Sequence, residues 1–369
     1  MKLCCFFNYA PLYRSSIYKA IDDEFDTQFY FGREVEFIKT ASGIKKLNYA
    51  IFKRAPIEFE NRIILKKFLW RSKLIALAFK NYDSFVLTGD LSFSYIPFLL
   101  LCKIFRKKVY GWGHGPKARE GKLSFLSWWV LNQMTGFFSY GENGRQRMIK
   151  LGYPEKKIHV IFNSLTKRIV PSTSIESKIF QTQFGNDNPV LIFIGRLTPV
   201  KKLNNLILLL KRLNQNNHFC NLIIVGDGPC KADLIKLSKD FRVNNRVWFY
   251  GDCYNEAINA ELIYNSDVCI SPGNVGLTAL HALQYGTPII SHSDFETQMP
   301  EYEVIVPYST GLLFEKDNYD DCYAKTCEWL EFAKGRREEI RQNCYDMING
   351  KWNSDNQIEI LKKVLLDDK

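Results

Sequence analysis

The chain has 369 residues, of which 46% are hydrophobic and 24% charged, and a formal net charge of +11 at pH 7. This composition excludes an intrinsically disordered protein, and the length favours two hydrophobic cores over one. The longest apolar run, residues 91–102, has about half the ~20 residues that a membrane-spanning helix needs, so no transmembrane segment is expected.

The positive charge is concentrated in the first half of the chain. Residues 1–168 contain 29 Lys and Arg against 13 Asp and Glu, whereas the remainder contains 21 against 26. Between residues 45 and 73 the basic residues are interleaved with Phe, Leu and Trp, a mixture typical of surfaces that contact anionic lipid headgroups. A solvated basic helix face explains the pattern equally well. Nucleic acid is not an expected partner, because no helix-turn-helix, RNA-recognition or zinc-finger signature accompanies the charge.

The ten cysteines have no spacing that would build a zinc site or a redox pair, so we expect reduced thiols in a cytoplasmic protein. The first apolar run, residues 3–7, is too short for the core of a signal peptide and is interpreted as a first strand. The expected location is the cytoplasm, with the inner face of the cell membrane as a candidate peripheral site.

Short apolar runs alternate with helical patterns along the first half, which is the signature of parallel βαβ units. Strands are expected at residues 3–7, 28–31, 84–87, 108–111, 136–139 and 159–161. Helices are expected at residues 15–23, 60–79, 94–105, 124–133 and 141–150. Together they predict one doubly wound α/β domain.

Turn-rich residues interrupt this pattern between residues 163 and 189, and a second α/β cycle follows. Its strands are expected at residues 190–194, 220–225, 247–250, 268–270 and 288–291, with a closing region at 304–307. Its helices are expected at residues 203–214, 231–239, 255–265 and 277–285. We therefore divide the chain into residues 1–165, 166–350 and a last helical segment, 351–369.

The second domain begins with a buried strand that ends at Gly195, and the following loop carries Arg196 and Lys201. Both cations would lie at the carboxyl end of the sheet, where they can clamp a diphosphate and neutralise a departing one. Two surface cations beside an ordinary loop are the alternative. Farther on, Gly226 and Gly228 form a tight turn but lack the third glycine of the dinucleotide fingerprint, so an oxidoreductase is not expected.

A third block runs from a strand through Gly273 and Asn274 into a helix that starts near Gly276 and Leu277. A helix start of this kind binds phosphate through its backbone N–H groups and its dipole. The alternative is a strand-to-helix turn that serves folding only. No acidic metal-binding motif is apparent in these blocks.

The three blocks, in this order, resemble the large retaining GT-B glycosyltransferase family known as group 1, together with Asn163 at the domain junction and residues 310–314. The resemblance covers essentially the whole second domain. It implies an α/β fold of two Rossmann-like doubly wound domains that face a central cleft, with residues 351–369 crossing back to the first. It also implies metal-independent transfer, with retention, from a nucleotide-diphosphate sugar to a glycan or lipid-linked acceptor of cell-surface polysaccharide, UDP being favoured over GDP.

The resemblance assigns roles to individual residues of the second domain. Arg196 and Lys201 would hold the diphosphate at Gly195, while Gly276 and Leu277 would donate backbone N–H groups to it. Tyr254 would lie against the base. Many family members carry two glutamates with seven residues between them, and this chain has Gly273 and His281 at those positions. His281 is then expected to bond the ribose, and Asn274 to take over part of the contact with the sugar.

In the first domain, His114 follows an expected strand end and corresponds to a histidine that the family often places near the reaction centre. A histidine that merely caps the loop is the alternative. Tyr13 and Arg14 stand where the family often has a glycine-rich loop, and they are candidates for acceptor contacts. Because the glutamate pair is missing, a catalytically weak sugar-nucleotide-binding or scaffold subunit and a GT-B-fold nucleotide-sugar epimerase remain alternatives.

Overall fold

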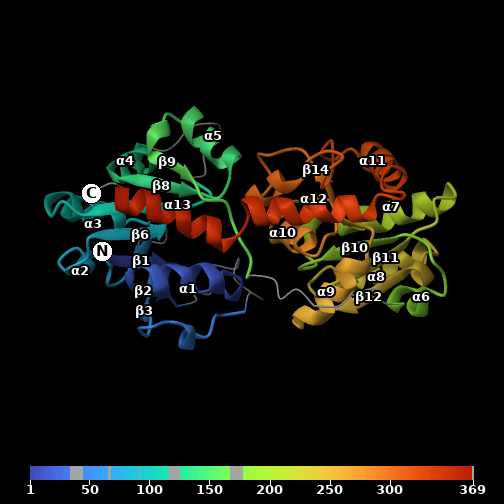
Figure 1. Ribbon diagram of the computed structural model, residues 1–369, viewed down its shortest axis with the longest axis horizontal. Coiled ribbons are helices and arrows are strands. Elements are labelled where there is room, and N and C mark those ends of the chain that lie inside the picture. Colours follow the sequence, from blue (N-terminus) through green and yellow to red (C-terminus); the bar gives the residue numbers. More distant parts are fainter. Residues whose placement is uncertain (34–44, 65–67, 91, 116–124, 167–177, 368–369) are drawn as a thin grey trace. The chain divides into compact units, whose positions relative to one another are not determined.

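The structure is a computed structural model, and it describes residues 1–33, 45–64, 68–90, 92–115, 125–166 and 178–367. The chain divides into two compact units, each with its own sheet (Figure 1). Unit 1 comprises residues 1–167 and 352–369, and unit 2 comprises residues 168–351. In the described part, no helix is long and apolar enough to cross a bilayer.

Unit 1 is built on a seven-stranded parallel sheet with the strand order β3-β2-β1-β6-β7-β8-β9. The strands are β1 (Lys2–Phe7), β2 (Asp26–Gly32), β3 (Ile57–Phe59), β6 (Ser84–Thr88), β7 (Lys108–Gly113), β8 (Gly136–Ser139) and β9 (Ile158–Val160). The central strand β1 is buried from its second residue to its last. Such an uninterrupted apolar run is what a strand covered on both faces requires.

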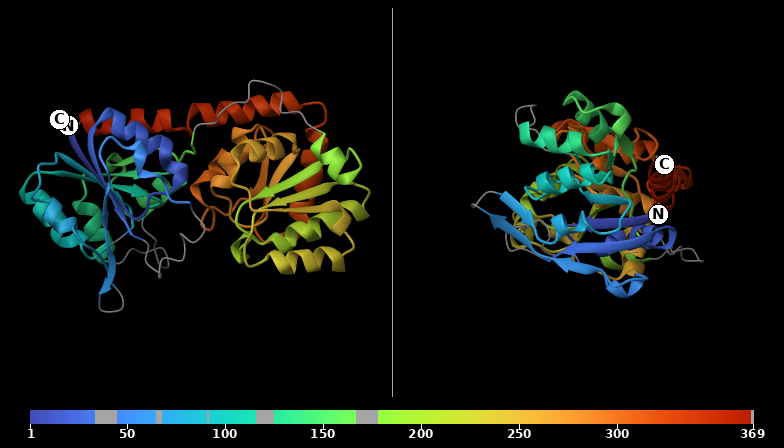
Figure 2. Two further views of the ribbon diagram at one scale, coloured as in Figure 1. Left: turned by 90° about the horizontal axis from the view of Figure 1, so that it is seen from below. Right: turned by 90° about the vertical axis from the view of Figure 1, so that its left-hand side faces the viewer.

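Helices cover both faces of this sheet, as Figure 2 shows. One face packs against α1 (Ser15–Glu24) and α13 (Ser354–Asp367), which contact each other. The other face is covered by α2 (Leu74–Leu77), α3 (Tyr95–Ile104), α4 (Phe125–Gln133) and α5 (Glu142–Lys150). Gln357 of α13 donates to the backbone oxygen of Phe162 (2.8 Å) and accepts from the Ser164 hydroxyl (2.5 Å). The last helix therefore belongs to unit 1.

Unit 2 contains a six-stranded parallel sheet with the order β12-β11-β10-β13-β14-β15. The strands are β10 (Val190–Ile194), β11 (Asn221–Val225), β12 (Val247–Gly251), β13 (Val268–Ser271), β14 (Ile289–His292) and β15 (Gly311–Phe314). The helices are α6 (Ile179–Phe184), α7 (Leu203–Gln215), α8 (Lys231–Asp240), α9 (Glu256–Asn265), α10 (Leu277–Gln284), α11 (Tyr319–Phe332) and α12 (Arg337–Gly350). The expected α/β class, with two parallel sheets, is confirmed.

The helix predicted over residues 60–79 is wrong. Strands β4 (Asn61–Ile64) and β5 (Phe68–Arg71) pair antiparallel there, with Asn61 opposite Arg71, and only the short α2 follows. The β-branched and aromatic residues of this segment favour strands. Residues 65–67, part of the basic stretch, and residues 167–177, part of the predicted inter-domain segment, lie outside the described residues.

The structure also corrects the interpretation of residues 45–73 as a basic, aromatic surface. Phe52 and Phe59 are buried in the two cores of unit 1. Five of the described cations form ion pairs: Lys46 with Glu58 (2.6 Å), Arg54 with Asp26 (2.6 Å), Lys53 with Asp23 (3.5 Å), Arg62 with Glu60 (2.5 Å) and Arg71 with Asp90 (2.6 Å). These aromatic side chains stabilise the fold instead of covering an outer face.

The closing strand lies later than the predicted residues 304–307. A 3-10 helix, Pro300–Val304, occupies the preceding segment, and β15 begins at Gly311. Gly311 has φ +156°, and a Cβ atom there would lie 1.7 Å from the Ile289 carbonyl oxygen, so only glycine lets β15 pair with β14 at this point.

Candidate active site

The carboxyl end of β10 is held against the loop after β11 by two glycines. Gly195 donates its N–H to the Val225 oxygen (2.9 Å). Gly226 has φ +145°, and a Cβ atom there would lie 1.9 Å from the Gly195 oxygen. Glycine is therefore required at Gly226 by the close approach of the two loops, and the approach fixes where the chain leaves β10.

Lys201 ends the 3-10 helix Pro199–Lys201, and it contacts the turn before α10. Its Nζ donates to the Asn274 oxygen (2.7 Å), and its own backbone oxygen accepts from the Gly273 N–H (3.0 Å). A Cβ atom on Gly273 would lie 2.1 Å from the Val200 oxygen, so a side chain at this position would push the turn away. The structure thus brings together two blocks that are about seventy residues apart in the chain.

The Lys201 ammonium group lies in an unfavourable electrostatic environment. Burial and the positive charge of Arg196 lower the pKa of Lys201 to about 8, while the negative charge of Glu301 opposes the shift. Arg196 is exposed, whereas Glu301, from the 3-10 helix Pro300–Val304, is only 2% exposed. A bound anion would relieve the repulsion between the two cations, so this location suits a phosphate group.

The N-terminus of α10 lies at the same end of the sheet. Gly276 is its N-cap and Leu277 its first residue, and no side chain caps the first turn. The Thr278 hydroxyl donates to the Ile194 oxygen (2.9 Å), which ties the helix start to β10. Because the first N–H groups of a helix have no acceptor within it, this terminus presents backbone donors beside Lys201.

His281, on the next turn of α10, interacts with a carboxylate that the sequence analysis missed. Its Nε2 lies 2.8 Å from Oε1 of Glu256, the first residue of α9, and the Tyr285 hydroxyl donates to the same oxygen (2.6 Å). Burial raises the pKa of Glu256, but the hydrogen bonds from His281 and Tyr285 outweigh this effect and lower the pKa below its usual value. The carboxylate is therefore ionised at neutral pH. Tyr254, two residues earlier, is 59% exposed.

In unit 1 the structure connects His114 and Arg14 through Tyr140, which the sequence analysis also missed. His114 follows β7 and is exposed, and its ring centroid lies 4.9 Å from that of Tyr140. The Arg14 guanidinium donates to the Tyr140 hydroxyl and lies 5.1 Å from the centre of the same ring. Tyr13 is half-buried, with its ring centre 5.6 Å from that guanidinium.

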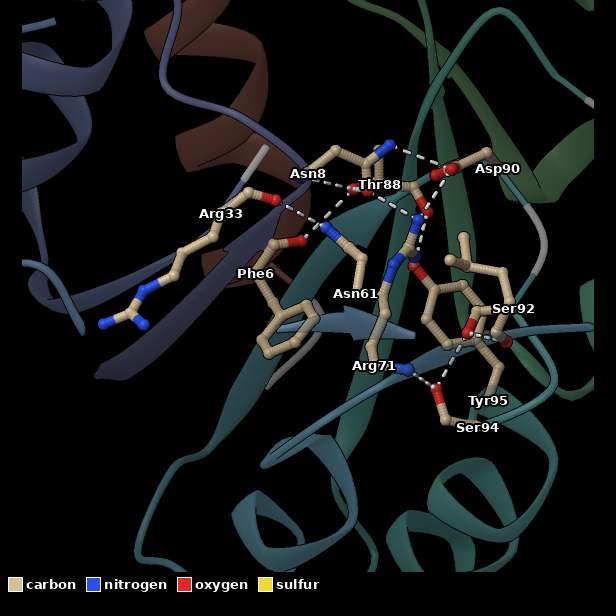
Figure 3. A network of polar contacts seen from close by, with 11 residues as sticks. Phe6, Asn8, Arg33, Asn61, Arg71, Thr88, Asp90, Ser92, Ser94 and Tyr95 are labelled. Atoms are coloured by element: carbon tan, nitrogen blue, oxygen red, sulfur yellow. Dashed lines mark hydrogen bonds and ion pairs between the residues drawn. The ribbon is translucent and has the colours of Figure 1, made fainter. Parts of the chain in front are cut away.

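A second polar cluster lies at the carboxyl ends of β1 and β6, and Figure 3 shows its contacts. The Arg71 side chain is fully buried, and its Nη2 donates to Oδ2 of Asp90 (2.6 Å) and to Oδ1 of Asn8 (2.5 Å). Asn8 Nδ2 also donates to Oδ2 of Asp90 (2.9 Å), whose side chain is 44% exposed. The cluster holds a partly solvated carboxylate in one orientation. The sequence signal for this cluster was a polar residue close after each buried strand, Asn8 directly after β1 and Asp90 two residues after β6.

Among the described residues, no group of three or more His, Cys, Asp or Glu side chains could hold a metal ion. All ten cysteines are free thiols, most of them buried.

Residues 174–347 match the family described as Glycosyl transferases group 1. An uncharacterized glycosyltransferase of Methanocaldococcus jannaschii, MJ1607, is 30% identical over 38% of this chain and 37% of its own length. The N-acetyl-alpha-D-glucosaminyl L-malate synthase of Bacillus anthracis is 24% identical over 58% of this chain and 56% of its own. The chain thus spans between about a third and just over half of the length of these relatives.

Solved structures resemble the whole chain. The lipopolysaccharide outer core galactosyltransferase WaaB, in its apo form, has a TM-score of 0.73 at 15% identity, with both chains covered completely. Anabaena Alr3699/HepE, in complex with UDP, has a TM-score of 0.72 at 16% identity, again over the full length of both chains. At this identity the likeness shows the fold, and it confirms the expected GT-B class.

Proposed function

We propose that this chain is a glycosyltransferase of the group 1 family, which residues 174–347 match, and that it transfers a sugar from a nucleotide-diphosphate sugar to a glycan or lipid-linked acceptor. The supporting comparisons include solved structures of HepE with UDP and with UDP-glucose, which favour UDP as the nucleotide. The lipopolysaccharide enzyme WaaB favours a cell-surface polysaccharide as the product. Donor and lipid-linked acceptor would meet at the cytoplasmic face of the cell membrane.

The observation that carries the proposal is the position of Lys201. Its ammonium group is held by Asn274 at the start of α10, and the charge of Arg196 acts on it. In the proposal both cations bind the diphosphate, and the N–H groups of Gly276 and Leu277 complete the cradle. These charges stabilise the diphosphate more as it departs, because its negative charge grows in the transition state.

The reaction proposed proceeds on one face of the sugar. The bond between the anomeric carbon and the diphosphate oxygen breaks, and the electron pair leaves with that oxygen. The acceptor hydroxyl oxygen bonds to the anomeric carbon from the same side, which retains the configuration, and its proton passes to the departing phosphate. No protein nucleophile and no metal ion takes part in this scheme.

The remaining site residues receive roles within the same proposal. Tyr254 stacks on the base, the Glu256–His281 pair accepts from the ribose hydroxyls, and Asn274 contacts the sugar at the turn that begins with Gly273. In unit 1, His114 is assigned a role in the transfer step. Acceptor groups are bound by Arg14 and Tyr13, and by the Asp90 carboxylate, which is held by Arg71 and Asn8.

A thermal-shift screen with UDP-, GDP- and other activated sugars tests the donor assignment, because a ligand that binds only the folded state raises the melting temperature. We expect UDP-sugars to give the largest shift, and the shift to disappear in Lys201→Ala. The selected donor then enters a turnover assay with wild-type protein. A shift without hydrolysis or transfer would favour the non-catalytic binding subunit, and no shift with any nucleotide sugar would refute the proposal.

A further inference from the structure

The outer side of α3 and α4 carries large apolar side chains that the fold leaves in water. Ile104 is 72% exposed and Phe125 is 80% exposed. Together with their exposed neighbours they form what we call the α3–α4 patch: Phe79, Leu100, Ile104, Phe105, Phe125, Leu126 and Trp128. Scattered single apolar residues are normal on a protein surface, but a contiguous group usually marks an interaction site.

The helices that carry or adjoin these residues are neighbours on one face of the sheet. Helix α3 packs against both α2 and α4, and the three helices cover the same face of the sheet. The rings of Phe79 and Phe105 touch at a centroid distance of 5.4 Å. Lys103 of α3 donates to the Gln133 side chain of α4 (3.4 Å), which bridges the two helices.

Helix α3 has no polar face. Its inner side, which includes Phe98 and Leu99, is buried in the core, while Leu100 and Ile104, one turn apart, lie exposed. A surface helix of a globular protein normally opposes its apolar stripe with charged residues. Here the only charged residue of the helix is Lys103. The outer apolar side chains of α3 are not part of the core. Contact with another apolar environment would explain why the helix carries them.

The charge around the patch is positive. The described residues 92–115 and 125–135 contain four Lys and Arg and no Asp or Glu. Lys80 follows Phe79, and Lys103 and Arg106 are exposed beside Ile104 and Phe105. Apolar side chains surrounded by cations match an anionic bilayer, whose acyl boundary accepts the former and whose headgroups attract the latter. A second copy of the chain fits less well, because a symmetric contact would bring two basic rims together.

We propose that the α3–α4 patch docks this protein on the surface of an anionic lipid bilayer. The patch lies in unit 1 and shares no residue with the donor site, and docking requires no nucleotide sugar. The proposal therefore stands or falls separately from the catalytic assignment.

Vesicle flotation with the full chain tests the docking. We expect the wild-type protein to float with vesicles of phosphatidylglycerol and phosphatidylcholine, and much less with phosphatidylcholine alone. Ile104→Ser combined with Phe125→Ser should weaken partitioning on the order of tenfold or more, because two apolar side chains are no longer buried. Removing the charges of Lys103 and Arg106 should weaken it about fivefold for each charge. Arg106→Asn suits this purpose, since Arg106 has φ +52° and asparagine tolerates that backbone.

Phe219→Ser is the matched control, because Phe219 is 47% exposed but lies in unit 2. It should float like the wild type. Melting temperatures verify that each variant is folded. If the variant with Ile104→Ser and Phe125→Ser fails to fold, the variant that removes the charges of Lys103 and Arg106 tests the docking by itself. Absence of flotation with anionic vesicles, or equal flotation of wild type and both variants, overturns the proposal. It is also overturned if light scattering shows a dimer that the apolar variant converts to monomers while no vesicles bind.

Discussion

The Nζ atom of Lys201 lies 2.7 Å from the backbone oxygen of Asn274, and this hydrogen bond joins the loop after β10 to the turn before α10. It holds a cation beside the first turn of a helix, where backbone N–H groups lack acceptors within the helix. The charge and the helix terminus can thus act on one bound anion.

Truncating either cation should slow transfer. We expect Lys201→Ala and Arg196→Ala each to reduce kcat about a hundredfold or more, the usual effect of removing one preorganised charge stabiliser. Steady-state kinetics with the donor selected by the thermal-shift screen measure the effect. Lys231→Ala is the control, because Lys231, the first residue of α8, pairs with Asp227 in the loop after β11. Wild-type rates in both site variants would refute the assignment.

The activity should fall as the pH rises through about 8. Lys201 binds an anion only when protonated, and its pKa in the free protein is lowered to about 8 by burial and by Arg196. The protonated form therefore predominates below that pH and is lost above it. The pH profile of kcat/KM reports this ionisation, because it reflects groups of the free enzyme.

Two variants provide the controls for this profile. Lys201→Arg should abolish the alkaline limb, since arginine stays charged throughout. Arg196→Ala should move the limb to higher pH, because it removes a positive charge that lowers the Lys201 pKa. An alkaline limb that stays in place in both variants would mean that another group titrates.

Adding a methyl group at the two close approaches should destabilise unit 2. In Gly226→Ala and Gly273→Ala the new Cβ atom would lie 1.9 and 2.1 Å from a backbone oxygen, so the loops must separate. We expect the free energy of unfolding to fall by about 1–3 kcal/mol. Gly335→Ala, also in unit 2, where φ is +71° but no atom lies within 4 Å, separates backbone strain from crowding. Urea denaturation measures all three, and equal losses would contradict the crowding explanation.

Neutralising Glu256 should weaken donor binding more than it slows chemistry. Glu256→Gln keeps the shape but removes the charge that holds His281 and Tyr285. If the pair binds the ribose, KM for the donor should rise about tenfold with kcat nearly unchanged, since hydrogen bonds to charged groups contribute about 1.5–3 kcal/mol. Glu261→Gln, on the same helix, is the matched control. A loss confined to kcat would assign the pair to another role.

The sequence predicts the regular part of this fold well. Strand β10 consists of continuous apolar residues, as does β11 after Asn221, so their burial on two faces can be predicted from the sequence. The hairpin β4–β5 was misjudged because its short segment contains both apolar residues and helix-compatible charges. What decides its structure is the pairing of Asn61 with Arg71, a contact that no periodicity reveals.

The candidate site was predictable where residues follow strand ends and unpredictable where they come from other elements. Lys201 and Gly276 stand next to a strand or a helix start, and their positions follow from the chain order. Glu256 bonds to His281 from a different helix, and the charge of Glu301, from a 3-10 helix, acts on the pKa of Lys201. Such contacts depend on tertiary packing, which a local pattern does not encode.

The packing of α13 on α1 makes unit 1 discontinuous in the sequence. A fragment that stops at residue 166 would leave the apolar surface beneath Leu361 and Leu365 uncovered. The two units therefore need different expression strategies if they are to be studied separately. Unit 2 can be expressed as one continuous segment, residues 178–351. Unit 1 needs residues 1–166 fused through a linker to residues 352–369, or supplied with the last helix as a separate peptide.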